Sequence, residues 1–137
     1  MKRTIAILCL LCMVFALPVS GTAEDSKIRP CASEVIKSTR ISVAVKDGTL
    51  TASANVRAKN TASKIGFSSV TVYVLNGSTW KLVASTQDIY QSNKIMMSAT
   101  ISCAVESGKT YKVECNSYVE IGSKSDTGYA YKTITVD

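Results

Sequence analysis

The 137-residue sequence predicts an all-β domain, a two-sheet antiparallel sandwich of about seven strands. Three observations lead to this prediction. Apolar and polar residues alternate with a period of two along most of the chain after residue 33, which is the pattern of half-buried strands. A helical period is nearly absent from the same stretch. Turn signals recur about every 8 to 12 residues, the spacing typical of two sheets packed face to face.

The first 23 residues have the layout of a secretory signal peptide. Two positive charges precede an apolar run from Ile5 to Leu17, and small residues from Gly21 to Ala23 supply a cleavage site. No second apolar run follows, so we expect a secreted, extracellular product without an integral membrane segment after cleavage. The expected organisation is a signal peptide at 1–23, a flexible leader at 24–33 and a single β-sandwich domain at 34–137.

The first two strands form a hairpin around Asp47-Gly48, a dipeptide that favours the positive φ of a two-residue turn. Apolar and polar residues alternate on both sides of it, over residues 41–46 and 49–57. The turn sets the register of three apolar pairs: Val45–Leu50, Val43–Ala52 and Ile41–Ala54. All six side chains then lie on one face, which a slip of one residue would destroy.

Five further strands follow from the same alternation. Val70, Val72 and Val74 lie on one side of the next strand, and Asn76-Gly77 turns the chain into a strand at residues 80–84. The remaining strands are expected at 97–103, 111–115 and 129–136. Three stretches between them are expected to be loops or irregular: 59–64, 87–93 and 122–128.

The run Gly108-Lys109-Thr110-Tyr111-Lys112-Val113 resembles the entry to the sixth strand of fibronectin type III and related immunoglobulin-like domains. In those domains a tyrosine sits at the corner between the sheets, and its hydroxyl bonds to the backbone. The resemblance assigns that role to Tyr111. Together with Lys64-Ile65-Gly66, Val70-Thr71-Val72-Tyr73 and Trp80, the run also looks like a family of small secreted Gram-positive bacterial β-sandwich proteins of unknown function. The resemblance covers about residues 29–136 and implies fold and export, with no catalytic residue to carry over.

The complete sequence contains no histidine, which excludes imidazole nucleophile systems, a histidine general base and histidine-ligated zinc. A pair of carboxylates could still hydrolyse glycosides. The candidates fall at turns or on outward strand positions and include no obvious buried pair: Glu106, Glu114, Glu120 and Asp126. No acidic loop has the spacing of a calcium site. We therefore predict a protein that is not an enzyme and needs no metal or other cofactor.

Three cysteines follow the predicted cleavage site: Cys31, Cys103 and Cys115. Alternation points Cys103 and Cys115 inward, and in an exported protein a disulfide between them would contribute about 3 kcal/mol by closing a short loop. The pairings of Cys31 with Cys103 or with Cys115 stay open, because the strands that carry Cys103 and Cys115 could belong to different sheets. Cys31 would then be free or would link to another molecule. A catalytic thiol is not expected, because no histidine exists to activate it.

Tyr73 and Trp80 form a candidate aromatic face, with Leu75 and Leu82 nearby. A turn of two or four residues at Asn76-Gly77 puts Trp80 on the side of Tyr73, opposite the valines, where it could bind sugar rings or peptide. A three-residue turn reverses this parity and packs Trp80 against the valines. A lone tryptophan in a β-sandwich is more often in the core, so we expect a core position, with the exposed face as the alternative.

Positive charge is concentrated early in the mature chain. Between Lys27 and Lys64 eight Lys or Arg accompany two acids, whereas from Ile65 onward six Lys balance six acids. Four of the early cations form a candidate basic patch: Arg40, Lys46, Arg57 and Lys59. Such a patch would hold the protein on anionic cell-envelope polymers or acidic glycans. Alternatively, it is a solvated face that keeps the protein soluble and protects an edge strand.

The sequence thus predicts a secreted, non-enzymatic immunoglobulin-like module that binds or coats at the cell envelope. Its expected partners are anionic polymers, glycans or a protein. One alternative is a carbohydrate- or small-ligand-binding module that uses Tyr73 and Trp80, and another is an enzyme inhibitor that presents the loop at 122–128. Nucleic acid is not an expected partner, because export separates the protein from nucleic acid and because basic and aromatic residues do not interleave in the sequence.

Overall fold

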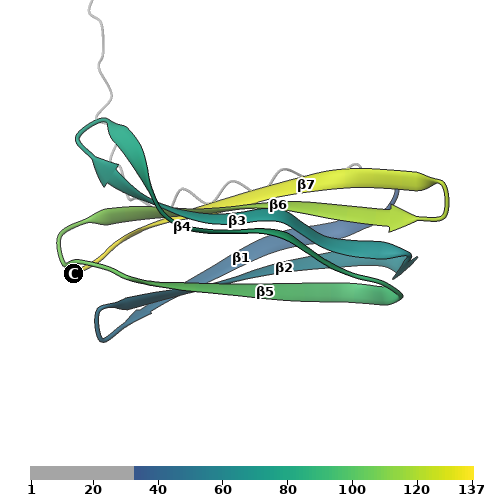
Figure 1. The fold of residues 1–137 in the computed structure, drawn as a ribbon, viewed down its shortest axis with the longest axis horizontal. Helices are drawn as coiled ribbons and strands as arrows, with labels where there is room; N and C mark the ends of the chain where they lie inside the picture. Colours follow the sequence, from purple (N-terminus) through teal and green to yellow (C-terminus); the bar gives the residue numbers. More distant parts are fainter. Residues whose placement is uncertain (1–32) are drawn as a thin grey trace, which may run out of the picture.

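The structure of the protein, a computed structural model, describes residues 33–137. These residues form seven antiparallel strands and no helix (Figure 1). The strands are β1 (Ile36–Lys46), β2 (Thr49–Ala62), β3 (Lys64–Asn76), β4 (Thr79–Gln91), β5 (Lys94–Ala104), β6 (Thr110–Ile121) and β7 (Lys124–Thr135). Consequently no helix within residues 33–137 is long and apolar enough to cross a membrane. The predicted signal peptide and nearly all of the predicted leader lie outside the described residues.

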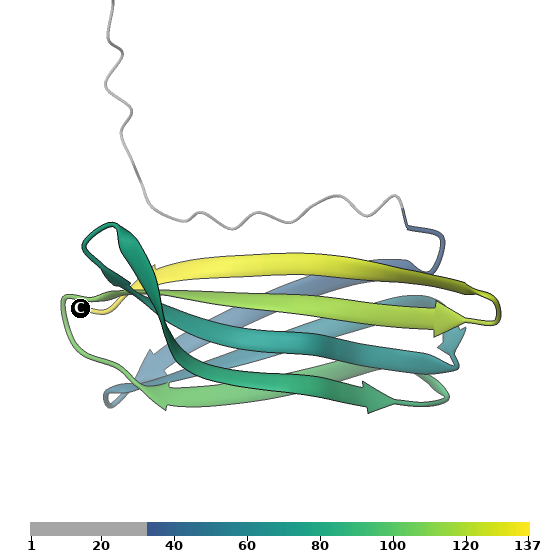
Figure 2. The ribbon, with the colours of Figure 1, turned by 45° about the horizontal axis from the view of Figure 1, so that its top comes forward.

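The strands form two layers, as the sequence predicts (Figure 1 and Figure 2). One sheet has the order β1-β2-β5 and the other has the order β4-β3-β6-β7. The chain crosses between the sheets after β2, after β4 and after β5. Each sheet has one face in the core and one in solvent, so the domain has two separate outer faces.

The β1–β2 hairpin has the predicted register, with the three apolar pairs Val45–Leu50, Val43–Ala52 and Ile41–Ala54. Its turn residues, Asp47 and Gly48, have φ values of 50° and 71°. Glycine adopts this left-handed region without strain, and aspartate adopts it more readily than most residues. The turn chemistry therefore decides which side of the hairpin enters the core.

The core lies between the inner faces of the two sheets and is mostly aliphatic. Phe67 is the largest of the fully buried side chains in this core. Most of the alternating positions of β3, β5 and β6 that the sequence points inward are buried, while Val74 and Cys103 are half-buried; the buried ones are Val70, Val72, Met97, Ala99, Ile101, Tyr111, Val113 and Cys115. A hydrogen bond between the Thr39 and Ser117 hydroxyls (2.6 Å) joins the two sheets inside this core. Every buried polar side-chain atom in residues 33–137 has a hydrogen-bond partner.

Tyr111 occupies the corner between the sheets. Its ring is buried, and its hydroxyl accepts a hydrogen bond of 2.9 Å from the backbone N–H of Glu106. This bond holds the connection between β5 and β6 against the start of β6. The backbone bond predicted for Tyr111 is confirmed, while the wider resemblance to fibronectin type III domains stays a prediction.

Two stretches predicted as irregular are largely strand. β2 continues to Ala62 and β3 begins at Lys64, so Ser63 alone separates them. The Ser63 backbone N–H donates to the Glu120 carbonyl at 2.8 Å, which fixes the chain where it changes sheets. Similarly, β4 continues to Gln91. Both stretches lie at strand ends or on a sheet edge, where much of the chain meets solvent and the alternating pattern disappears.

The tip of the β3–β4 hairpin bends away from the sandwich, on the outer side of the four-stranded sheet (Figure 2). The bend lies close to a β-bulge: Val72 pairs with Ala84 but Tyr73 pairs with Leu82, which leaves Val83 without a partner. A bulge of this kind increases strand twist and bends the strand that carries it. The bent hairpin therefore gives the outer face of this sheet a raised wall.

Candidate functional site

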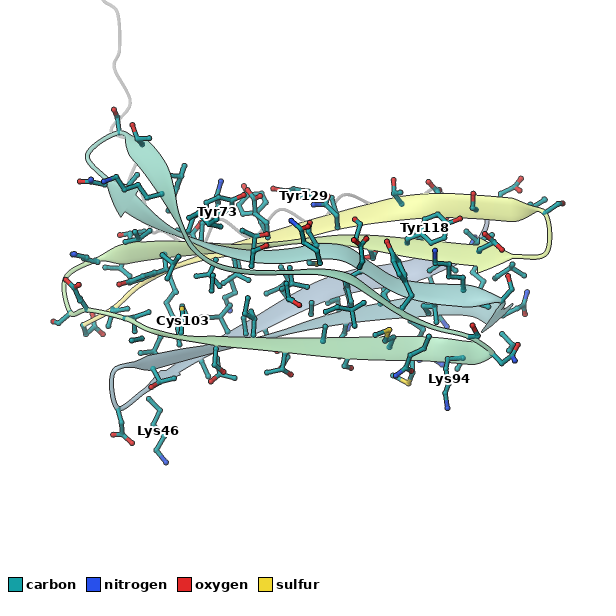
Figure 3. The ribbon with its side chains drawn as sticks, viewed as in Figure 1. Lys46, Tyr73, Lys94, Cys103, Tyr118 and Tyr129 are labelled. Carbon is teal, nitrogen blue, oxygen red and sulfur yellow. The ribbon has the colours of Figure 1, made fainter. Side chains whose placement is uncertain are left out.

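The outer face of the three-stranded sheet carries the predicted basic patch. Five exposed cations make up what we call the cationic face: Arg40, Lys46, Arg57, Lys59 and Lys94. Arg57 pairs with Ser38, which is two residues from Arg40 on β1. The two arginines are therefore diagonal neighbours, with Cα atoms about 7 Å apart. Figure 3 shows Lys46 and Lys94 on the side of the sandwich away from the four-stranded sheet. The strand register places Arg40, Lys46 and Arg57 on this face, and Lys94 extends the face onto β5; the binding role of the patch stays a prediction.

Charge is divided unequally between the two sheets. The strands β1, β2 and β5 contain six Lys or Arg and no Asp or Glu. The strands β3, β4, β6 and β7 contain five Lys and four acids. None of the ion pairs found within residues 33–137 involves the cationic face. The charges of this face therefore remain available to an external anion.

Short polar side chains cover the space between these cations. Three hydrogen bonds cross from β2 to β5: Thr51–Ser102 (3.2 Å), Ser53–Thr100 (3.4 Å) and Asn55–Ser98 (2.5 Å). Lys46 lies six residues from Arg40 on β1, which corresponds to about 20 Å along the strand. Apart from the exposed Met96, which pairs with Arg57, the cationic face is thus a long strip with short side chains between its charges, a shape that suits an extended polymer.

Trp80 lies on the outer face of the four-stranded sheet, so its expected core position is wrong. The β3–β4 turn has only two residues, because Asn76 pairs with Thr79. Trp80 then pairs with Leu75 and shares the side of Tyr73, opposite the buried valines. Its side chain is half-buried. The exposed aromatic face, which was the alternative, is the arrangement that forms.

Trp80 borders a hollow of about 260 Å³, which we call the aromatic groove. The groove is lined by Trp80, Lys112, Tyr129, Tyr131 and Thr133. Lys112 lies between Tyr73 on β3 and Thr133 on β7 in the strand register. Its ammonium is 4.8 Å from the ring centroid of Trp80 and 5.2 Å from that of Tyr73, which are cation–π distances. These contacts fix the positions of both rings beside the groove.

Lys112, which lines the aromatic groove, is held in an ion pair, and two tyrosines line the groove beside it. Lys112 Nζ lies 2.7 Å from Glu114 Oε1, and each of these side chains is 20% exposed. On β7, which is the neighbour of β6, the rings of Tyr129 and Tyr131 have centroids 6.0 Å apart and planes tilted by 43°. Burial, reinforced by the Glu114 carboxylate, raises the pKa of Tyr129 to about 12, so its hydroxyl stays protonated at neutral pH. The groove is thus lined by aromatic rings and the Lys112 ammonium, and the Glu114 carboxylate lies next to it, against that ammonium.

A second aromatic cluster lies at the other end of the same outer face. Tyr90 and Tyr118 pack edge to face, with ring centroids 6.1 Å apart. Lys64 Nζ lies 4.2 Å from the Tyr90 ring centroid and 5.5 Å from that of Tyr118. Gly66 pairs with both tyrosines in the strand register, so the rings flank a position that has no side chain. The cluster covers this part of the sheet and is best explained as packing.

Cys103 and Cys115 are free thiols in the structure, so the disulfide predicted between them is not formed. Cys103 is half-buried near the end of β5, whereas Cys115 is buried on β6 in the other sheet. Cys115 lies five residues beyond Thr110, the start of β6, which is about 17 Å along the strand. A disulfide requires Cα atoms within about 7 Å of each other. Cys31, the third cysteine, lies outside the described residues.

We expect Cys115 to resist alkylation in the folded protein and Cys103 to react slowly. Burial raises the pKa of Cys115 to about 12 and also raises the pKa of Cys103, and only the thiolate reacts. Treatment with iodoacetamide at about pH 8, followed by mass spectrometry of proteolytic peptides, measures each thiol separately. Both should be modified in urea. Equal rates for the two thiols in the folded protein would contradict the buried position of Cys115.

The acidic residues face outward, as predicted. Glu114 and Glu120 alternate with the buried positions of β6, and Asp126 is exposed on β7. Glu106 forms an ion pair of 2.6 Å with Lys109 at the β5–β6 connection. Within residues 33–137, no three His, Cys, Asp or Glu side chains come together in a way that could hold a metal ion.

The loop expected at residues 122–128 is not formed. Ile121 pairs with Lys124, so Gly122 and Ser123 make a two-residue turn and β7 begins directly after it. The inhibitor hypothesis relied on a long presenting loop at this place. That loop is replaced by a tight hairpin, which removes the structural reason for the hypothesis.

The structure brings Tyr73 and Trp80 together and adds residues that sequence reasoning missed. Lys112, Tyr129, Tyr131 and Thr133 line the groove together with Trp80, whereas Tyr73 lies beside the groove, against Lys112. Alternation along residues 129–133 is visible in the sequence and places the two tyrosines and the threonine on one side of a strand. Only the strand order shows that β7 lies two strands from β3, with Lys112 of β6 between them.

No protein-family model matches this chain, and no curated protein matches it. Among solved structures, it is similar to a protein from Archaeoglobus fulgidus, with 11% sequence identity over 74% of this chain and 98% of that chain. The TM-score of this match is 0.38, and at that level of similarity it supports no argument about fold or function.

Proposed function

We propose that the protein is a secreted, non-enzymatic, immunoglobulin-like module that binds extended anionic polymers, such as those of a cell envelope, through the cationic face. One observation carries the proposal. The three-stranded sheet contains six cations and no acid in its strands, and its outer face has no ion pairs among the described residues. Cations that are not neutralised within the protein attract an external polyanion.

The geometry of the face favours a polymer over a small anion. A single exposed charge pair contributes little, because water and salt screen it. Several cations spread along a strip about 20 Å long act together on a polymer that bears many charges. The short Ser and Thr side chains between the cations allow the polymer to lie close to the sheet.

The remaining parts of the proposal rest on the sequence. The pattern of residues 1–23 supports secretion. The complete absence of histidine, together with acidic residues that face outward, supports a binding role rather than catalysis.

Reversing two charges of the cationic face should abolish binding to a polyanion. We expect the double variant Arg40→Glu, Arg57→Glu to lose about 100-fold in affinity for dextran sulfate at low salt, because each arginine changes from attraction to repulsion. Binding of the unmodified protein should also disappear at about 0.5 M salt, where charges are screened within a few ångströms. Biolayer interferometry on immobilised dextran sulfate measures both effects.

A variant with the same net charge provides the control. Lys64→Glu, Lys81→Glu makes an equal change in charge on the four-stranded sheet, at two exposed positions that take part in none of the ion pairs of the described residues. It should bind dextran sulfate within about fivefold of the unmodified protein, because its charges lie on the opposite layer. Equal losses for the two double variants, or equal binding of uncharged dextran, would rule out the cationic face as the binding site.

A further inference from the structure

We propose that the aromatic groove is a second, independent binding site, and that it takes a neutral pyranose ring. The site lies on the four-stranded sheet, whereas the cationic face lies on the other sheet. Figure 3 shows Tyr73 and Tyr129 on one side of the sandwich, with Lys46 and Lys94 on the other. The ligand class follows from the ion pair, from the ring faces and from the size of the hollow.

The ion pair selects a neutral ligand that carries hydroxyl groups. Lys112 and Glu114 neutralise each other at 2.7 Å, and both are mostly buried. A bare anion that approaches Lys112 would also meet the Glu114 carboxylate, which lies beside the groove and 2.7 Å from the Lys112 ammonium, and a bare cation would meet the Lys112 ammonium that lines the groove. An apolar peptide would bury both charges without giving them hydrogen-bond partners, which is costly. A hydroxyl group can accept from Lys112, and a neighbouring hydroxyl can donate to Glu114, so a sugar satisfies both charges together.

The aromatic rings supply the apolar part of the site. Trp80 lies on one side of Lys112, on the bent hairpin, and Tyr129 and Tyr131 lie on the other side, on β7. The C–H face of a pyranose is apolar while its rim is polar, which matches aromatic rings that surround a charged pair. The Tyr129 hydroxyl remains protonated at neutral pH and interacts with the Glu114 carboxylate, which links the β7 ring to the ion pair.

The dimensions limit the occupant to one or two sugar rings. The hollow of about 260 Å³ is smaller than the pockets of about 300 to 1,000 Å³ that enclose drug-sized ligands. The ends of a longer oligosaccharide would therefore extend into solvent along the sheet. Affinity for such a shallow site is expected near the millimolar range.

Trp80 is the one tryptophan of the complete sequence, so its fluorescence reports directly on the groove. The experiment titrates the folded protein with neutral hexasaccharides of glucose (β-1,4 and α-1,4), xylose and N-acetylglucosamine, each to about 10 mM. We expect at least one of them to shift the emission with a Kd near 1 mM or below, and 0.5 M salt should leave that Kd within about twofold. No shift and no calorimetric heat with any of the four would overturn the proposal.

Variants locate the binding site. Trp80→Ala should lower, at least tenfold, the affinity for the sugar that shifts the emission, as measured by calorimetry. Trp80→Phe, which keeps a ring, should retain most of that affinity. Leu82→Ala removes an apolar side chain that is 64% exposed on the same hairpin and should leave binding unchanged. Glu114→Gln gives a second test that leaves the rings in place and should also weaken binding. If Trp80→Ala and Leu82→Ala bind equally, the groove is not the site.

Charged probes distinguish this proposal from the polyanion proposal. Hexagalacturonate should bind the groove more weakly than the neutral sugar, because its carboxylates meet Glu114. Preferential quenching of Trp80 by hexagalacturonate or by a hydrophobic peptide would overturn the neutral-sugar assignment. Arg40→Glu, Arg57→Glu should leave sugar binding unchanged, so either proposal can fail without the other.

Discussion

Replacing Phe67 with alanine is expected to lower the free energy of unfolding by about 3 to 5 kcal/mol. Phe67 is fully buried on β3, between the two sheets. Its removal takes a large apolar surface out of the core and leaves a cavity that the strands on either side, held by their hydrogen bonds, cannot close. A domain of this size is stable by only about 5 to 15 kcal/mol, so this one change consumes a large part of the total. Urea denaturation followed by far-ultraviolet circular dichroism measures the loss.

Leu82→Ala is the matched control for Phe67→Ala. It also shortens a large apolar side chain in the four-stranded sheet, but Leu82 is mostly exposed and should contribute less than about 0.5 kcal/mol. The slope of the denaturation curve should stay the same in both variants, because the same surface unfolds. Similar losses for the two variants would show that the inner face of β3 is not the core.

Gly66→Ala is expected to destabilise the protein by about 3 kcal/mol, although it adds a single methyl group. A Cβ at this position would be 1.9 Å from the carbonyl oxygen of Ile89 and 2.8 Å from the Cα of Tyr90. Both are backbone atoms of β4, so no side-chain rotation relieves the clash. The β3–β4 pairing would have to separate near Tyr90. Hydrogen exchange should show faster exchange in β4, and thermal denaturation should show a lower midpoint.

Gly77→Asn tests whether the effect at Gly66 is steric. Gly77 has a φ of 64°, and a Cβ there would have no neighbour within 4 Å. Asparagine tolerates the left-handed region better than most residues, so we expect a cost below about 1 kcal/mol. If Gly66→Ala proves no more costly than Gly77→Asn, β4 does not pack as closely on β3 as the structure indicates.

The β1–β2 hairpin shows which parts of the fold were open to prediction. Asp47-Gly48 specifies a two-residue turn, and the alternation on both sides agrees with the register that this turn imposes. Local chemistry and burial therefore point to the same arrangement. The hydrogen bond that the Tyr111 hydroxyl accepts from the Glu106 backbone could be predicted equally well, because it depends on a short sequence pattern.

The strand ends were missed because burial there is incomplete. Residues 87–91 belong to β4, at the edge of its sheet, and the polar side chains Gln87 and Asp88 are exposed. Without one dry face, a strand shows no alternation, and polar residues then resemble a loop. The cysteine pairing was missed for a different reason. Alternation gives the direction of a side chain but not the height of that residue along the sandwich.

The aromatic groove depended on information that a single sequence does not contain. The position of Trp80 follows from the length of one turn, and Asn76-Gly77 is compatible with more than one length. The contributions of Lys112 and the two β7 tyrosines depend on the strand order, which follows from the three crossings between sheets. The cationic face was easier to predict, because its four original members lie on one hairpin with a known register.

The position of β5 has a consequence for how fast the domain folds. β5 completes the three-stranded sheet by pairing with β2, although all of β3 and β4 lie between them in the chain. The entropy of closing this long segment is lost before the pairing forms, whereas each of the three hairpins closes locally. Two-sheet β-proteins with such distant pairings typically fold in milliseconds to seconds. During that interval the edge of β2 that β5 will cover remains unpaired, and mutual repulsion among its cationic neighbours opposes aggregation of the unfinished chains.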